Sequence, residues 1–176
     1  MIIRIVLAVV AIGAMSLAAF AQTPDQNEAS RKATAERLVM GERACMNCDL
    51  FQVDLSYQEL EGRNLTGARL RQADLSLSTL DKSKFAGANM SMVNGFGIRA
   101  EHADFSDVNF EDAVLVGGSF NGAKFKNVKL AKANFSGSDL STATGLTQEQ
   151  LDAACGDAET RLPKGLSLPA CKSDSY

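Results

Sequence analysis

A five-residue period runs from Cys48 to Leu146 and constrains the fold of this chain more than any other feature. Reading every fifth residue from Leu50 to Gly145 gives 20 positions, and 17 of them hold Leu, Phe or Met. The residue two places earlier is mostly small or apolar, and Asp or Asn recurs between the two rows. An amphipathic helix has a period of about 3.6 residues and a half-buried strand one of about 2, so neither explains the pattern. The pattern therefore indicates a tandem repeat.

The repeat unit resembles the A(D/N)LXX unit of the pentapeptide-repeat family. The resemblance covers 48–146 of the 176 residues, in units such as 67–71 (GARLR), 72–76 (QADLS), 87–91 (GANMS), 132–136 (KANFS) and 137–141 (GSDLS). It implies that four units form one square coil and that coils stack into a right-handed quadrilateral β-helix, an all-β solenoid. The repeat then supplies about five coils, roughly 24 Å long at a spacing of about 4.8 Å per coil. In this family the recurring Asp and Asn residues support backbone turns and are not catalytic carboxylates.

In such a stack, residues 20 apart lie above one another, which predicts the columns of the core. The first two columns are Leu50, Leu70, Met90, Phe110 and Leu130, and Leu65, Phe85, Phe105 and Phe125. A fourth column contains Gly95 in place of a large side chain, which predicts a locally distorted third coil. Val93 and Ile98 are placed to refill part of the gap, and Phe96 is a candidate to turn inward, because an unfilled void destabilises a core.

The ends of the chain differ in character from the repeat. Residues 1–21 have a basic start, an apolar run and a small-residue cleavage pattern, which indicates a signal peptide; an uncleaved membrane anchor is the alternative. Cleavage would place the protein in an exported, oxidising space, most plainly a bacterial periplasm, without stable membrane insertion. We expect 22–47 to hold a polar leader up to Glu28 and a capping helix within 29–43.

The segment 147–176 is expected to hold a C-terminal capping helix and a tail closed by a disulfide. Thr147 and Gln150 have the spacing of a capping box, with Leu146 and Leu151 as a hydrophobic staple. This predicts a helix over 148–155, ended by Gly156.

Four cysteines in an exported chain favour disulfides. Local pairing, Cys155 with Cys171 and Cys45 with Cys48, is favoured because a cross-pair would have to span the whole stack. The Cys45 to Cys48 motif also has the C-x-x-C form, so a thiol redox role or a metal role there stays open as a hypothesis.

Two outward features of the stack are candidate sites. Glu61, Asp81 and Glu101 form one acidic column, which is either a solvated face or a weak site for a divalent cation or a basic partner. Apolar residues gather on another side and form either a protein contact surface or part of the repacking around Gly95: Tyr57, Leu77, Phe96, Val114 and Val116.

The sequence contains no set of residues for catalysis. His102 is the only histidine, and no phosphate-binding glycine loop occurs, so we expect neither an enzyme nor a cofactor. The expected function is that of a rigid exported scaffold that binds an unknown protein through one face. Some relatives resemble DNA and protect DNA gyrase, but 49–145 carry 12 acidic and 10 basic side chains, and this balance disfavours a DNA mimic or a nucleic-acid partner.

Overall fold

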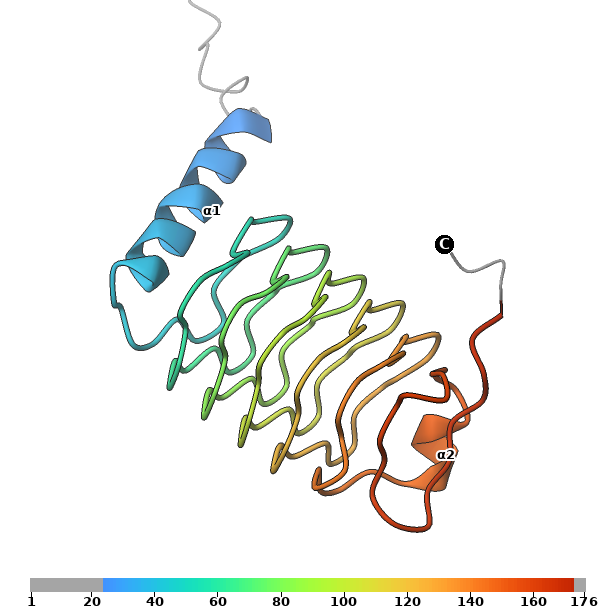
Figure 1. Ribbon diagram of the computed structural model, residues 1–176. Coiled ribbons are helices and arrows are strands. Elements are labelled where there is room, and N and C mark those ends of the chain that lie inside the picture. The colour runs from blue at the N-terminus through green and yellow to red at the C-terminus, as the bar shows by residue number, and fades with distance from the viewer. Residues whose placement is uncertain (1–23, 173–176) are drawn as a thin grey trace, which may run out of the picture.

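The computed structural model describes residues 24–172 and shows a stack of square coils with a helix at each end (Figure 1). Helix α1 spans Pro24–Val39, and helix α2 spans Gln148–Leu151. The predicted signal peptide at 1–21 lies outside the described residues. Across 24–172, no helix is both long enough and apolar enough to cross a bilayer.

Parallel β-bridges set the register of the stack. They join residues 20 apart, from Ala44 with Asn64 to Lys124 with Thr144, so each coil contains 20 residues and four faces. The coils occupy 49–68, 69–88, 89–108, 109–128 and 129–148. Each face contributes a single bridged residue, whose N–H and neighbouring groups bond to the coils above and below. The predicted solenoid with a 20-residue coil is confirmed, although its walls are short bridges and not long strands.

The predicted core columns are buried. All nine residues of the two columns that start at Leu50 and Leu65 are at most 2% exposed. The aromatic rings form a continuous set, in which Phe105 lies 5.3 Å from Phe85, 5.2 Å from Phe110 and 5.4 Å from Phe125, measured between ring centroids. Burial of each such ring inside the coils removes a large apolar area from water, and this burial stabilises the stack.

Turns between the faces use two repeated devices. The second residue of nearly every turn has a positive φ, as in Gln72 at 59° and Gly87 at 69°. The side-chain oxygen of the bridged Asp or Asn accepts a hydrogen bond from the N–H two residues later, as Asp54 does from Ser56 at 2.9 Å. The predicted use of the recurring Asp and Asn residues in turns is therefore confirmed.

Gly87→Ala is expected to lower the free energy of unfolding by about 1–2 kcal/mol, because an L side chain strains the left-handed backbone. A Cβ at Gly87 would meet no atom within 4 Å, so the effect reports on φ alone. Urea unfolding checks it. The reverse change at an equivalent turn position, Gln72→Gly, is expected not to lower stability, and equal losses in both variants would contradict this account.

The third coil is regular, so the predicted distortion at Gly95 is wrong. The Gly95 N–H donates a hydrogen bond to the Val114 carbonyl at 2.7 Å, in the same pattern as the equivalent residues of neighbouring coils. A Cβ at Gly95 would lie 2.9 Å from Cδ2 of Leu115 and 3.7 Å from Cδ1 of Ile98, so these side chains already occupy the space. Val93 and Ile98 are buried as expected, whereas Phe96 points outward and is 51% exposed. The space beside Gly95 is filled by Leu115 of the next coil and by Ile98 of the same coil, and not by Phe96.

Helix α1 differs in extent from the predicted N-terminal helix. It begins at Pro24, so most of the expected polar leader is helical, and it ends at Val39, before Gly41. Ala35 and Leu38 are buried in the same cluster as the core of the coils, so α1 packs against the first coil. The capping roles expected of 22–47 and of the C-terminal helix remain predictions.

Helix α2 is shorter than predicted. The capping box is present, with Thr147 Oγ1 accepting from the Gln150 N–H and Gln150 Oε1 accepting from the Thr147 N–H. The helix nevertheless ends at Leu151 and not at Cys155. The reason is competition from the β-ladder, because Cys155 bridges Asn134 and exchanges backbone hydrogen bonds with the last coil.

Candidate interaction surface

All exposed large apolar side chains of the coils lie on one side of the stack. Within 49–148 they are Tyr57, Leu77, Met92, Phe96 and Val114. They belong to one face and its two flanking turns, which we call the apolar face, formed by 51–57, 71–77, 91–97, 111–117 and 131–137. Val116, the remaining predicted member, is half-buried beside them. The structure therefore brings the five predicted residues together and adds Met92.

The second turn of the apolar face carries no charge along the whole stack. Its residues at 56–57, 76–77, 96–97, 116–117 and 136–137 are Ser, Gly, Tyr, Leu, Phe and Val. The next turn around the coil contains Glu61, Asp81, Lys82 and Glu101 in the equivalent positions. A contiguous uncharged and partly aromatic edge on an otherwise charged rod is typical of a contact surface, because isolated exposed apolar residues would be scattered over all sides.

The bulky side chains of this turn stand away from the coil. Tyr57 and Leu77 occupy positive-φ positions, with φ of 59° and 57°, and Tyr57 is 72% exposed. Leu77 extends along the turn toward the next coil, because a Cβ on Gly97 would lie 2.7 Å from its Cδ2. Glycine at position 97 therefore leaves room for the Leu77 side chain. Phe96 is exposed, so the prediction that its side chain turns inward is wrong.

A groove continues the apolar face at its C-terminal end. It has a volume of about 720 Å³ and lies between the last two coils and the C-terminal segment. Its apolar walls come from Ala113, Val114, Val116, Ala153, Ala154, Pro169 and Ala170. Asp112, Asp152, Lys132 and Lys172 are its charged members. The period-five pattern contained no signal for this groove, because one wall belongs to a segment outside the repeat.

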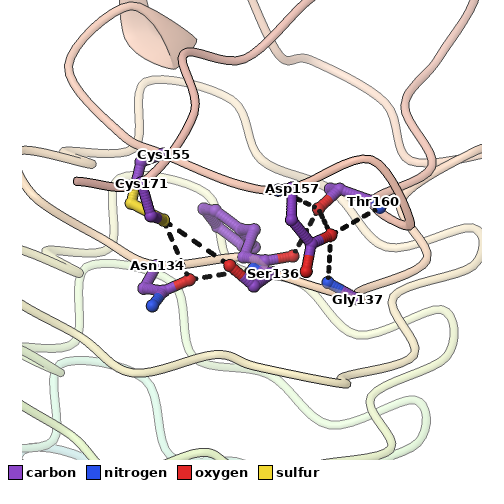
Figure 2. The surroundings of a disulfide bond; sticks show 8 residues. Asn134, Ser136, Gly137, Cys155, Asp157, Thr160 and Cys171 are labelled. Atoms are coloured by element: carbon purple, nitrogen blue, oxygen red, sulfur yellow. Dashed lines mark hydrogen bonds between the residues drawn. A yellow bond between two sulfur atoms is a disulfide. The ribbon is translucent and has the colours of Figure 1, made fainter. Parts of the chain in front are cut away.

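The C-terminal wall is held by the disulfide between Cys155 and Cys171 (Figure 2). Cys171 Sγ lies 3.3 Å from Asn134 Oδ1. Asp157 Oδ1 accepts hydrogen bonds from the N–H groups of Gly137 and Thr160, at 2.9 and 3.0 Å. The bond from Gly137 is the main cause that lowers the pKa of Asp157.

The second disulfide joins Cys45 and Cys48 at the entry to the first coil. Both pairs are those favoured by local pairing, and none of the cysteines within 24–172 is free. Cys45 is buried, whereas Cys48 is partly accessible. A thiol redox or metal role at this pair would first require reduction of the bond, and it stays a hypothesis.

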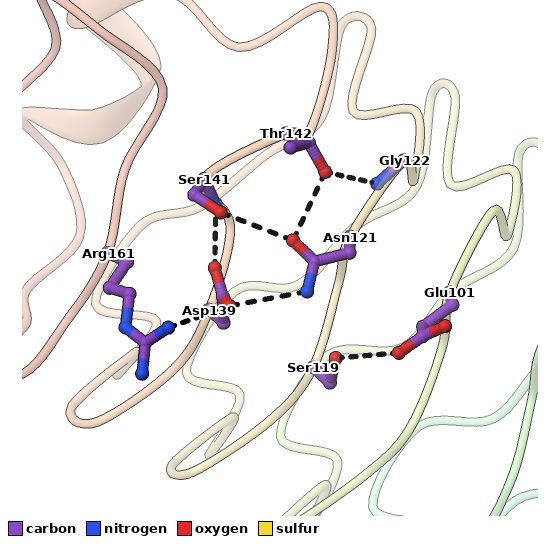
Figure 3. Close-up of polar contacts among 8 residues, drawn as sticks. All are labelled: Glu101, Ser119, Asn121, Gly122, Asp139, Ser141, Thr142 and Arg161. Carbon is purple, nitrogen blue, oxygen red and sulfur yellow. Dashed lines mark hydrogen bonds and ion pairs between the residues drawn. The ribbon is translucent and has the colours of Figure 1, made fainter.

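Two of the three carboxylates in the acidic column form ion pairs with neighbouring residues. Glu61 forms an ion pair with Lys82 at 2.6 Å, and this hydrogen bond is the main cause that lowers the pKa of Glu61. Asp81 pairs with Arg99 at 2.9 Å, and Glu101 accepts a bond from Ser119 Oγ at 3.3 Å (Figure 3). No cluster of three or more His, Cys, Asp or Glu side chains suited to a metal occurs in the part of the chain that the structure describes. A weak site for a divalent cation or a basic partner at this column stays a prediction.

A polar network on the same side ties the last two coils together (Figure 3). Asp139 accepts from the Ser141 N–H at 3.0 Å and from Asn121 Nδ2 at 3.3 Å, and it pairs with Arg161 at 3.4 Å. The bond from the Ser141 amide is the main cause that lowers the pKa of Asp139. These contacts favour the charged carboxylate in the folded state.

The depressed pKa of Asp139 gives an expected pH dependence. Its contribution to stability is fully present above the unfolded pKa of about 3.9 and is lost as the pH falls through the lower folded pKa. Between the two pKa values the carboxyl binds a proton in the unfolded state but not in the folded state, and this difference lowers the free energy of unfolding. Asp139→Asn is expected to reduce the loss of stability between pH 5 and pH 3, measured as the shift of the urea midpoint. An unchanged pH profile in the variant would contradict the assignment.

Solved structures of pentapeptide-repeat proteins match this chain at low identity, whereas no curated protein sequence matches it. Rfr23 from the cyanobacterium Cyanothece 51142 is 22% identical over 74% of this chain and 98% of its own, with a TM-score of 0.37. HetL from Nostoc sp. strain PCC 7120, involved in heterocyst differentiation regulation, is 16% identical over 78% and 92%, with a TM-score of 0.36. QnrB1, a plasmid-mediated fluoroquinolone resistance protein, is 22% identical over 73% and 80%, with a TM-score of 0.31.

The family model for pentapeptide repeats matches 48–85, 59–94 and 103–141 with 8 copies. These segments lie in the coils whose 20-residue register, buried apolar columns and Asp or Asn turns are described above. The sequence pattern, the structure and the family model therefore agree, and the chain belongs to the pentapeptide-repeat family.

Proposed function

We propose that this protein is a non-enzymatic, exported scaffold that binds a protein through its apolar face. The observation that carries the proposal is the placement of every exposed large apolar side chain of the coils on that one face. The regular backbone of the stack holds these side chains at fixed spacing, so little conformational entropy is lost when a partner binds. A rigid apolar surface with polar margins is the usual composition of a protein interface.

The residues outside the apolar face support this role and not catalysis. His102, the only histidine of the chain, is exposed and lies against Gly122. Several carboxylates of the coils are engaged in turns and surface ion pairs, as shown by Asp54 and Asp81. The near balance of acidic and basic side chains continues to disfavour a DNA mimic, whose surface would need an excess of negative charge.

Crosslinking and affinity capture from the native compartment test the proposal. We expect Phe96→Asp and Val116→Asp to abolish capture of partners, because a buried unpaired carboxylate is strongly unfavourable at an interface. Ala86→Asp is the matched control, since Ala86 occupies the same turn position as Phe96 in a turn outside the apolar face. Capture that is unchanged in the first two variants, or lost in the control as well, would contradict the proposal.

Export is tested separately by N-terminal sequencing of the protein purified from its cellular fraction. A mature chain that starts at Gln22 in an exported fraction is expected from the cleavage pattern of 1–21. A thiol count on the same material distinguishes the scaffold from a redox protein, because disulfides at both cysteine pairs leave no reactive thiol. Recovery of the intact chain from the cytosol would overturn the exported part of the proposal.

A further inference from the structure

We propose that the occupant of the apolar face is a second copy of this chain, packed antiparallel about a twofold axis that crosses the third coil. This inference rests on the proposed function, because it names the partner of the same surface. The axis would pass the row of Ser91, Asn94 and Phe96, so that the first coil of one copy faces the fifth coil of the other. The pairing is isologous and closes as a dimer.

Charge complementarity favours the antiparallel direction. The first turn of the apolar face carries Phe51, Arg71, Ser91, Glu111 and Ala131 in one column, 20 residues apart. Arg71 and Glu111 lie one coil to either side of Ser91, so reversal of the stack places Arg71 of each copy opposite Glu111 of the other. Both side chains are exposed, and neither forms an ion pair within the described chain. Two symmetric ion pairs would then flank the axis.

Shape complementarity points to the same direction. The second turn carries the bulky residues Tyr57 and Leu77 in the first two coils, and Gly117 and Gly137 at the same position in the last two. The 720 Å³ groove opens beside the small-residue half, next to Val114 and Val116. In the antiparallel arrangement, Leu77 of one copy faces Gly117 of the other, and Tyr57 faces Gly137. Leu77 and Tyr57 thus each face a glycine, which leaves room for the larger side chain.

At the axis, the pairing brings identical uncharged groups together. Phe96 meets Phe96, where aromatic rings interact favourably, and the Asn94 amide both donates and accepts, so it can bond to its symmetry mate. Asp74 is the one carboxylate that would face an apolar residue, Val114. It keeps its bonds from the Ser76 N–H at 2.9 Å and from Asn94 Nδ2 at 3.1 Å, which compensate for part of the lost hydration.

The parallel alternative is electrostatically poor. With the two stacks running in the same direction, the uncharged second turn of one copy would cover the charged first turn of the other. Arg71 and Glu111 would then be buried against Leu77 and Val116 without partners, and unpaired buried charges are strongly unfavourable. The antiparallel dimer pairs the same two charges, and this difference decides between the two arrangements.

Analytical ultracentrifugation of the full mature chain, with the disulfides intact, tests the inference. The wild-type protein is expected to sediment as a dimer at micromolar concentration. Arg71→Glu alone and Glu111→Arg alone are each expected to raise the dissociation constant by about tenfold or more, because each places like charges together. Mixing the two variants is expected to restore dimers. In the mixed dimer, the two substituted side chains carry opposite charges and face each other at one site, and the native pair of Arg71 with Glu111 forms at the other.

The mixing result is specific to the antiparallel arrangement. Lys126→Glu, a charge reversal on an exposed residue outside the apolar face, is the control and is expected to leave the dimer unchanged. A monomeric wild-type chain, or single variants that dimerise normally, or a mixture that stays monomeric, would overturn the inference. A monomeric chain that still captures another protein through Phe96 would refute the dimer and leave the proposed function standing, so the two failures are distinguishable.

Discussion

Phe105→Ala is expected to lower the free energy of unfolding by about 3–5 kcal/mol. The Phe105 ring is fully buried and lies within 6.1 Å of four other rings, those of Phe85, Phe110, Phe120 and Phe125. Its removal leaves a cavity at the centre of the stack, and the hydrogen-bonded walls hold the coils apart so that the cavity collapses poorly. Urea unfolding followed by circular dichroism measures the loss.

Phe96→Ala is the matched control for this prediction. The residue type is the same, but the ring is exposed and contributes little to the core. We expect a change within about 0.5 kcal/mol in the free energy of unfolding of the monomer. Similar losses in the two variants would mean that the aromatic column is not the source of stability.

Loss of the Cys155–Cys171 disulfide is expected to lower the free energy of unfolding by about 3 kcal/mol, because the bond closes a loop and restricts the unfolded chain. The two cysteines are 16 residues apart, and the bond holds 156–171 against the last coil. The double variant Cys155→Ser with Cys171→Ser removes the bond without leaving a free thiol. Thermal unfolding measures the loss, and trypsin cleavage at Lys164 is expected to become faster than in the wild type.

The pair Cys45 and Cys48 provides the internal comparison. These residues are separated by only 3 positions, so their bond restricts a much shorter loop and its removal is expected to matter less. The double variant Cys45→Ser with Cys48→Ser should keep the tail resistant to trypsin. A larger loss of stability in this variant than in the C-terminal one would contradict the loop argument.

The architecture of the coils was predictable because the repeat is a local rule applied many times. Once four units make a coil, the position of a residue in the five-residue unit decides whether it is buried, bridged or in a turn. Leu50 and Phe105 are buried and Asp54 supports a turn for this reason alone. The same arithmetic placed Tyr57 and Leu77 on a common outer side.

Predictions that depended on packing between coils were less successful. Gly95 was expected to leave a hole, yet Leu115 from the following coil fills it, because neighbouring layers share one continuous core. Phe96 consequently has no space inside and stays exposed. The prediction of the acidic column named only its carboxylates. In the structure, Lys82 and Arg99 reach two of these carboxylates from neighbouring units.

The period of five gave the buried row along the chain, and the resemblance to the pentapeptide-repeat family added four units per coil. Together these two sequence features predicted the solenoid, its register of 20 and the identity of its buried columns, because the columns follow from spacing along the chain once the coil size is known. Only the tertiary structure decided where the two helices end and where the groove beside Val114 lies. Those features arise where the non-repeating ends meet the coils. Contacts between segments distant in sequence and without a shared period leave no regular pattern in the sequence.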